Sequence, residues 1–321
     1  MTVMESDTIR ENPDLSQTDI NAGFETRDYN DGSENMHYYT SDSVNRRLRT
    51  TDIALNVLDK PYEIPERFRE YSKIMLEHQL GQVEPGQFEN HRICGMYSDL
   101  KPDTDTATIG MVEYYDLLAT FYSFPYVYRN ERGIIEFKGS SYIYNDFGVI
   151  YPLSLMLGAN PIGANTVAIT TDNKILIHKQ DDNAHVNPGR LMPSGSGSCS
   201  WHDYIDINAE TLQQIVKHGA EYKLRHESNI PEECKLTTKV MGMARVPIGM
   251  KPDFYCFTQL SMSWDELKAA GADAFDVVEA EDAGHISDAL IAYIEKNNAA
   301  NPGSVSIQLF LEAMFLAEIC R

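Results

Sequence analysis

Residues 212–230 read LQQIVKHGAEYKLRHESNI, and this stretch decides how the second half of the chain is interpreted. Its apolar side chains recur at helical spacing and form one stripe, which predicts an amphipathic helix over Leu212–His226. Asn229 and Pro231 end the helix, because Asn tolerates the left-handed backbone of a C-terminal cap and Pro cannot continue a helix. The charged residues near its end, from Lys223 to Glu227, are the first candidates for chemistry.

The segments on both sides of this helix indicate an α/β fold. Before it, two β-rich runs flank the turn pair Asp172-Asn173, which predicts a hairpin over Thr166–His178. A Gly/Ser-rich loop, Pro193–Ser198, follows the hairpin. After the helix we expect strands at Lys235–Val246, Phe254–Leu260 and Phe275–Ala280, a turn at Gly249–Pro252, and helices at Ile286–Lys296 and Val305–Cys320.

Three local sequences in this order resemble the Nudix hydrolase family. They are the hairpin Thr166–His178, the loop Gly189–Gly195, and the segment Ala220–Ile230, which is similar to a degraded form of the family's helix. That helix normally carries Arg-Glu-hydrophobe-x-Glu-Glu-x-Gly. The resemblance extends from about residue 164 to the C-terminus and leaves the first half unmatched. It implies a Nudix-type α/β/α sandwich, with the first half as an N-terminal α/β extension.

The resemblance also implies a reaction. Family members hold Mg²⁺ or Mn²⁺ on glutamates of this helix, and the metal neutralises a diphosphate and activates water. Glu227 matches the last metal-binding glutamate, and His226 replaces its neighbour. Glu227 and His226 are therefore the candidate catalytic residues, and Glu227 with Glu221 the candidate metal ligands. Glu221 lies on a different helical face, so it completes the metal site poorly.

Other substitutions change the charge of the expected site. Lys223 replaces the first glutamate, four positions before Glu227, where the two side chains are spaced to pair with each other. An ammonium can bind phosphate, but it does not acidify water as a dication does. We therefore expect weak metal binding, or a site completed by other segments. The candidate substrate-binding residues are Lys223, Arg190, Arg225, Ser194 and Gly195.

Composition narrows the choice of partners. The chain has 27 basic and 48 acidic residues, a net charge of -21, which argues against binding nucleic-acid polymers or anionic membranes. A phosphorylated small molecule or nucleotide needs only a local basic pocket or a metal ion. The five cysteines include no CxxC pair, which favours a reducing cytoplasm over a disulfide framework. The N-terminus has no signal-peptide pattern and no apolar run has membrane-spanning length.

The first half gives weaker signals. Residues 1–48 are polar and acidic and predict a flexible leader, although its aromatic residues could dock on the body or on a second subunit, as in a homodimer. Residues 49–160 predict an α/β segment, in which Met111–Phe121 has the pattern of a buried helix and Tyr142–Tyr144 that of a strand. The resemblance implies that residues 161–321 form a Nudix-like domain.

Three hypotheses for function follow. The first is a Nudix-like hydrolase that acts on a nucleoside-diphosphate-linked or other diphosphate-containing metabolite through an atypical metal site. The second is a catalytically inactive Nudix-fold protein that binds a nucleotide or metabolite, with Lys223, Arg190 and Arg225 replacing the metal. The third is an interaction or assembly protein. For the charged residues near Glu227, a solvated helix face is the simpler alternative.

Overall fold

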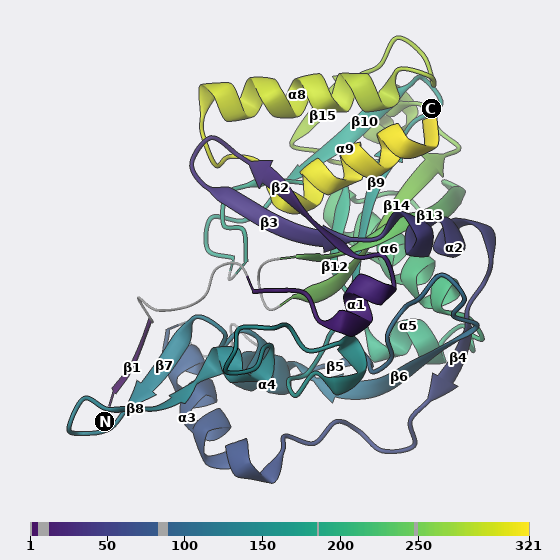
Figure 1. Ribbon diagram of the computed structural model, residues 1–321. Coiled ribbons are helices and arrows are strands. Elements are labelled where there is room, and N and C mark those ends of the chain that lie inside the picture. The colour runs from purple at the N-terminus through teal and green to yellow at the C-terminus, as the bar shows by residue number, and fades with distance from the viewer. Residues whose placement is uncertain (1, 6–12, 83–88, 185, 247–249, 321) are drawn as a thin grey trace.

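The computed structural model describes residues 2–5, 13–82, 89–184, 186–246 and 250–320, and it confirms the α/β class (Figure 1). The main sheet runs in the order β11-β10-β9-β14-β13-β3-β2, with β12 also paired to β9 and β15 to β10. Its strands are β2 (Glu25–Asn30), β3 (Asn35–Thr40), β9 (Gly163–Ile169), β10 (Lys174–Lys179), β11 (Leu191–Met192), β12 (Gly195–Ser198), β13 (Leu236–Val246), β14 (Lys251–Leu260) and β15 (Asp276–Glu279).

Helices cover both faces of this sheet. Successive side chains of a strand point to opposite faces, and β9 illustrates the division. Val167 and Ile169 pack in the core with α8 (Ile286–Ala300) and α9 (Ile307–Cys320). Ala164 belongs to the core on the other face, which contains the apolar stripe of α6 (Leu212–Ser228). The arrangement is an α/β/α sandwich, with α8 and α9 together on one side in Figure 1.

Helix α6 begins and ends as its sequence predicts. The Thr211 hydroxyl oxygen accepts a hydrogen bond from the backbone N–H of Gln214, and Oε1 of Gln214 accepts one from the backbone N–H of Thr211, which satisfies two free N–H groups. Asn229 caps the other end with a left-handed backbone at φ 48°. The same conformation at Asn173, φ 58°, closes the predicted hairpin between β9 and β10.

The N-terminal region differs from the expected flexible leader. Its described residues form β1 (Thr2–Glu5), α1 (Gln17–Asn21), β2, β3 and α2 (Asp42–Thr50), and β3 extends the main sheet beside β13. Burial of aromatic side chains explains the difference: the ring of Tyr29 stacks on Phe310 of α9 at 4.0 Å. The aromatic residues of the N-terminal region therefore dock on the body of the protein, which was one of the alternatives to a flexible leader. Residues 1 and 6–12 lie outside the described residues.

Residues 49–160 form two smaller sheets. One has the order β4-β6-β5, from β4 (Ala54–Val57), β5 (Arg92–Met96) and β6 (Thr106–Glu113), and the other joins β1 to β7 (Tyr126–Arg129) and β8 (Ile135–Lys138). Helix α3 (Arg69–Leu80) packs against the π-helical turn Leu117–Phe121. The prediction of a helix over Met111–Phe121 was partly wrong, because β6 continues to Glu113 before α4 (Tyr114–Asp116) begins. The strand predicted at Tyr142–Tyr144 was also wrong, since Gly139–Tyr142 is a 3₁₀ turn.

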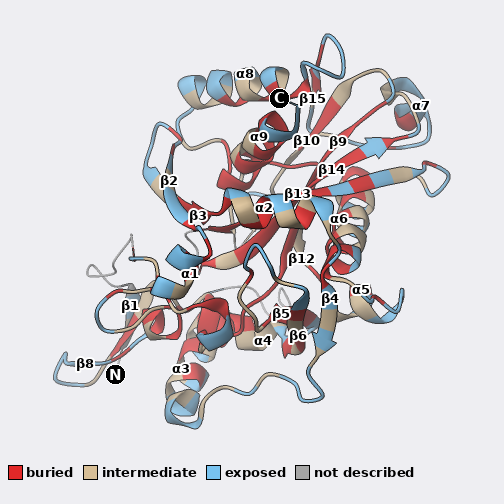
Figure 2. Cartoon of the chain, turned by 45° about the vertical axis from the view of Figure 1, so that its right-hand side comes forward, coloured by how far each residue is buried: buried red, intermediate tan, exposed pale blue. Residues whose placement is uncertain are grey.

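Backbone hydrogen bonds join the β4-β6-β5 sheet to the main body. Cys94 of β5 donates to the carbonyl of Cys199 and accepts from Ile162, both at 2.9 Å. The short helix α5 (Trp201–Ile205) lies at this junction. One buried core therefore extends across the junction, and buried segments are continuous there in Figure 2.

The remaining helix, α7 (Trp264–Ala269), follows β14. No described helix has the length and apolarity needed to cross a membrane.

Candidate functional site

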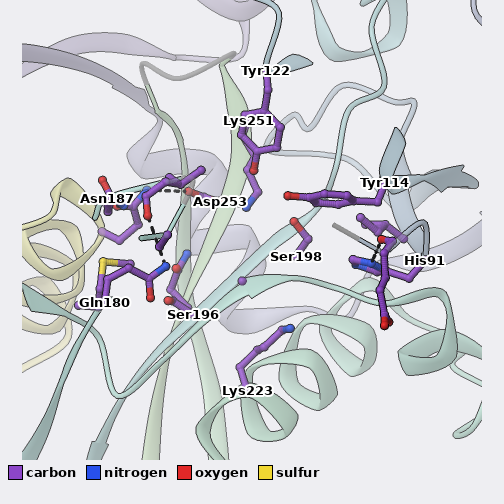
Figure 3. A pocket seen from close by; sticks show the side chains of 18 residues that line it. His91, Tyr114, Tyr122, Gln180, Asn187, Ser196, Ser198, Lys223, Lys251 and Asp253 are labelled. Carbon is purple, nitrogen blue, oxygen red and sulfur yellow. Dashed lines mark hydrogen bonds and ion pairs between the residues drawn. The ribbon is translucent and has the colours of Figure 1, made fainter. Parts of the chain in front are cut away.

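A cleft of about 600 Å³ lies where β12, the middle of α6 and the start of β14 meet residues 89–122 of the first half. We call it the central cleft. Figure 3 shows its side chains converging from these elements. Its lining includes Lys223 of α6, Ser196, Gly197 and Ser198 of β12, Lys251 and Asp253 of β14, Gln180 and Asn187 of the β10–β11 connection, Gln308 of α9, and the rings of His91, Tyr114 and Tyr122.

Two lysines bring positive charge to this cleft. Lys223 reaches it from α6, and Lys251 enters from the opposite wall (Figure 3). The ammonium of Lys251 lies 3.2 Å from Oδ1 of Asp253, which neutralises part of its charge. The Lys223 ammonium has an aromatic neighbour, the ring of Tyr222, at 5.7 Å. In a chain of net charge -21, two cations on one cavity offer positive points to an anion, although the carboxylates of Glu89 and Asp253 line the same cavity.

Glycines let β12 approach α6 closely enough to place Lys223. A Cβ on Gly195 would lie 2.5 Å from the backbone N of Leu224, so only glycine permits this contact. A Cβ on Gly197 would lie 2.7 Å from Cε of Lys223. The stem of Lys223 therefore passes over Gly197 on its way into the central cleft. The Gly/Ser stretch predicted as a loop is in fact a strand, because Gly195–Ser198 pairs with β9.

Glu227 lies behind the wall of the cleft. Its Oε2 accepts a 3.0 Å hydrogen bond from the backbone N–H of Ser196, so it fixes β12 to α6. Burial raises the pKa of Glu227 to about 7, although the Ser196 N–H and the charge of Lys223 oppose the shift. A carboxyl group with this pKa is partly protonated at neutral pH. Glu227 is half-buried and does not belong to the described lining of the cleft, but its carboxylate contacts one lining residue, Ser196.

The other residues predicted on α6 point elsewhere. His226 is exposed and packs on the ring of Tyr222 at 4.5 Å. Arg225 donates to the carbonyls of Pro231 and Cys234, at 2.7 and 2.9 Å, and so holds the chain that leaves the helix. Glu221 acts on His218, whose pKa is raised mainly by its hydrogen bond with Asp203 and further by nearby carboxylates that include Glu221. The structure thus places Lys223 in the cleft and these residues outside its described lining.

Arg190 and Ser194 also have partners of their own. Arg190 lies 3.3 Å from both Asp31 and Glu34, so it joins the N-terminal hairpin to the body. Ser194 is buried; its hydroxyl donates to the carbonyl of Leu176 and accepts from the N–H of Ala168, at 2.6 and 2.8 Å. Neither residue belongs to the described lining of the central cleft. These contacts were not visible in the sequence, since they depend on segments far apart in the chain.

The donor set around Glu227 does not fit Mg²⁺ or Mn²⁺. These ions prefer several oxygen ligands, and the helix offers one carboxylate with an ammonium one turn earlier. The Asp253 carboxylate in the cleft has the Lys251 ammonium 3.2 Å away, and this positive charge opposes a dication there. Among the described residues, no group of three or more His, Cys, Asp or Glu side chains could hold a metal ion. We therefore derive no chemical step through a metal here.

The aromatic wall of the cleft, formed by His91, Tyr114 and Tyr122, was not among the site residues predicted from the sequence. The rings of His91 and Tyr114 stack at 4.9 Å with planes 17° apart, and Tyr122 lies beyond Tyr114 at 6.5 Å between centroids. All three line the cleft from the first half of the chain. Lys251 was missed as well, although it precedes a predicted strand. No local pattern distinguishes it from an ordinary surface lysine.

Comparisons with known proteins give little further guidance. No family model matches the chain, and no curated protein matches it either. Among solved structures, the crystal structure of DR0079 from Deinococcus radiodurans is similar at 13% sequence identity and a TM-score of 0.32. That match covers 54% of this chain and 96% of DR0079.

Proposed function

We propose that the central cleft binds a small phosphorylated molecule, with the phosphate oxygens held between Lys223 and Lys251. The observation that carries this proposal is the presence of both ammonium groups on one cavity of an otherwise acidic protein. Phosphate bound by two fixed ammonium groups needs no dication to neutralise it. This is the second of the three sequence-based hypotheses, with Lys251 in place of Arg190 and Arg225.

A nucleotide fits the cleft better than a bare phosphate does. The stacked rings of His91 and Tyr114 offer an aromatic surface on which a base can pack. The amides of Gln180, Asn187 and Gln308 supply further donors and acceptors on the cleft. A volume of about 600 Å³ is in the range of small-molecule sites. We therefore extend the proposal to a nucleoside phosphate or a nucleotide-linked metabolite.

We also propose a distant relationship to the Nudix fold. The order of hairpin, Gly/Ser stretch and helix supports it, together with the contact between Gly195 and Leu224 and the α/β/α layers. Within that relationship, hydrolysis is the second candidate function. The observation that favours it is the raised pKa of Glu227, about 7, beside the cleft, since such a carboxyl group can exchange protons at neutral pH.

A ligand screen tests the binding proposal. Unfolding temperature is measured with nucleoside mono- and diphosphates, nucleotide sugars, dinucleotides and ADP-ribose, each with and without Mg²⁺ or Mn²⁺. We expect stabilisation by a nucleotide that is unchanged when the metal is chelated, because binding to the native state alone raises its stability. Stabilisation that requires a metal would favour the hydrolase. No stabilisation by any of these compounds would contradict the proposal and favour an interaction protein.

Turnover tests the second candidate separately. If the protein hydrolyses a diphosphate, Glu227→Gln should abolish that activity while the circular dichroism spectrum stays unchanged. Gln retains an acceptor for the Ser196 N–H but cannot take up a proton. Glu210→Gln on an exposed position before α6 is the matched control and should keep full activity. Retained turnover in Glu227→Gln would place the chemistry elsewhere.

A further inference from the structure

Asp253 is an unusual residue to find in an anion-binding cleft. Its side chain is almost fully buried, with 1% of its surface exposed, yet it lines the central cleft. Oδ1 is closed to solvent and forms no hydrogen bond with the described residues, although it is in an ion pair with the ammonium of Lys251 at 3.2 Å. Oδ2 accepts only a long hydrogen bond, 3.5 Å, from Gln308. A buried carboxylate normally has its acceptor sites filled, because burial removes its hydration.

The surrounding chain makes room for this carboxylate. Asp253 pairs in register with Gly163 of the neighbouring parallel strand β9. A Cβ on Gly163 would lie 1.7 Å from Oδ1 of Asp253 and 2.7 Å from Cε of Lys251. Any other residue at this position would displace both side chains. The absence of a side chain at Gly163 therefore lets the ion pair occupy the floor of the cleft.

An amide chain fixes the orientation of the neighbouring groups. Asn187 donates through Nδ2 to Oε1 of Gln308 at 3.0 Å, which directs the NH₂ group of Gln308 toward Asp253. Each member of this chain also lines the central cleft. The result is a polar end of the cleft in which the carboxylate of Asp253 is the strongest acceptor.

The charge of this end restricts what can bind there. A cationic ligand group would lie beside the Lys251 ammonium and be repelled by it. A second phosphate would meet the carboxylate. A neutral donor, such as a hydroxyl group, can satisfy the Asp253 carboxylate and leave its ion pair with Lys251 in place, once a small rotation of the side chain turns an oxygen from Gly163 toward the cleft. The Lys251 ammonium lies beside Asp253 and reduces the repulsion between this carboxylate and a phosphate, so both can share the cleft.

We propose that Asp253 binds hydroxyl groups of a sugar in the phosphorylated ligand, so that the cleft selects ribose-containing nucleotides over their dideoxy analogues. The inference rests on the proposed function, since it assigns a specificity-determining residue to the same cleft. A site that forms hydrogen bonds to a hydroxyl group rejects a ligand without it, because its buried acceptor is then left unpaired.

Titration calorimetry with matched nucleotides tests this inference. The probes are the ribonucleoside 5′-monophosphates and their 2′,3′-dideoxy counterparts. For the best-bound base we expect the ribonucleotide to bind about 10- to 100-fold more tightly, as a hydrogen bond to a charged group predicts. In Asp253→Asn the ratio should fall toward one, through weaker ribonucleotide binding and equal or stronger dideoxynucleotide binding. Lys296→Ala, on the exposed face of α8, is the control and should keep the wild-type ratio.

Each outcome separates the two proposals. Equal binding of both nucleotide forms to the wild-type protein would overturn the role of Asp253 and leave phosphate binding intact. Binding of neither form would overturn both. If Asp253→Asn lowers both affinities equally, Asp253 only supports the structure. If that variant does not fold, Gln308→Leu decides, because it leaves the Asp253 carboxylate with one donor fewer and should raise the ratio; an unchanged or lower ratio would contradict the inference.

Discussion

The backbone N–H of Ser196 donates a 3.0 Å hydrogen bond to Oε2 of Glu227, which ties β12 to the last turns of α6. Residues 31 positions apart in the chain thereby build one corner of the central cleft. The bond also brings a carboxyl group beneath the wall on which Lys223 lies. The protonation of Glu227, a half-buried group, is therefore coupled to the contact between β12 and α6 that shapes the cleft.

Protonation of Glu227 should make stability depend on pH. Burial raises its pKa to about 7 in the folded protein, above the ordinary value of 4.5. The folded state therefore binds the proton more tightly, and this contribution is fully present below about pH 4.5 and lost as pH rises through about 7. Glu227→Gln should remove this contribution. The unfolding free energy of the variant minus that of the wild type should therefore be larger at pH 8 than at pH 5, by about 3 kcal/mol.

Urea unfolding of the wild-type protein and Glu227→Gln at pH 5, 6, 7 and 8 measures this effect. The difference in unfolding free energy between the two proteins should grow across the series. Glu232→Gln, which removes an exposed carboxylate after α6, is the control and should show little change. Parallel pH profiles for Glu227→Gln and the wild type would mean that Glu227 has an ordinary pKa in the folded protein.

Lys223→Glu should strengthen Mg²⁺ binding at α6. The substitution places two carboxylates four positions apart on one helical face and removes the competing ammonium. Calorimetry with Mg²⁺ should show binding to Lys223→Glu that is at least about 10-fold tighter than to the wild type. Lys217→Glu adds the same charge earlier on α6 and should not reproduce the gain. Equal Mg²⁺ affinity in Lys223→Glu and wild type would show that residues 223 and 227 do not share one site.

The N-terminal segment should be essential to stability. Arg245 is fully buried, with 0% of its side chain exposed, and its guanidinium lies 3.2 Å from Asp19 of α1. Removing one partner of a buried pair leaves an uncompensated charge, so Asp19→Ala should cost about 3–5 kcal/mol. Asp265→Ala breaks an exposed pair with Lys268 and should cost less than about 1 kcal/mol. Urea unfolding compares them, and similar losses in both variants would contradict the buried role of Asp19.

Local patterns predicted the second half of the chain well. The stripe of α6, the Asn229 cap and the Asp172-Asn173 turn each depend on neighbouring residues, and all appear in the structure. The turn predicted at Gly249–Pro252 includes residues outside the described part of the chain. The α/β class followed from these elements, because an amphipathic helix and β-rich strands must cover one another's apolar faces.

Longer-range contacts decided what the sequence could not predict. The polar composition of residues 1–48 hid the burial of Tyr29 and Tyr39, which depends on α9 and on the added strands β2 and β3. For the candidate site, Lys223 and Glu227 were found by their spacing. Lys251 and Asp253 became visible only through the parallel pairing of β14 with β9.

The central claim is that Lys223 and Lys251 bind one phosphate group together, and calorimetry without metal tests it most directly. The best nucleotide from the ligand screen is titrated in EDTA into wild type, Lys223→Ala, Lys251→Ala and the double variant, with Lys296→Ala as control. We predict a loss of about 10-fold or more for each single variant, because each removes a charge-assisted hydrogen bond to phosphate. The double variant should show no measurable binding. Wild-type affinity in both single variants would contradict the account.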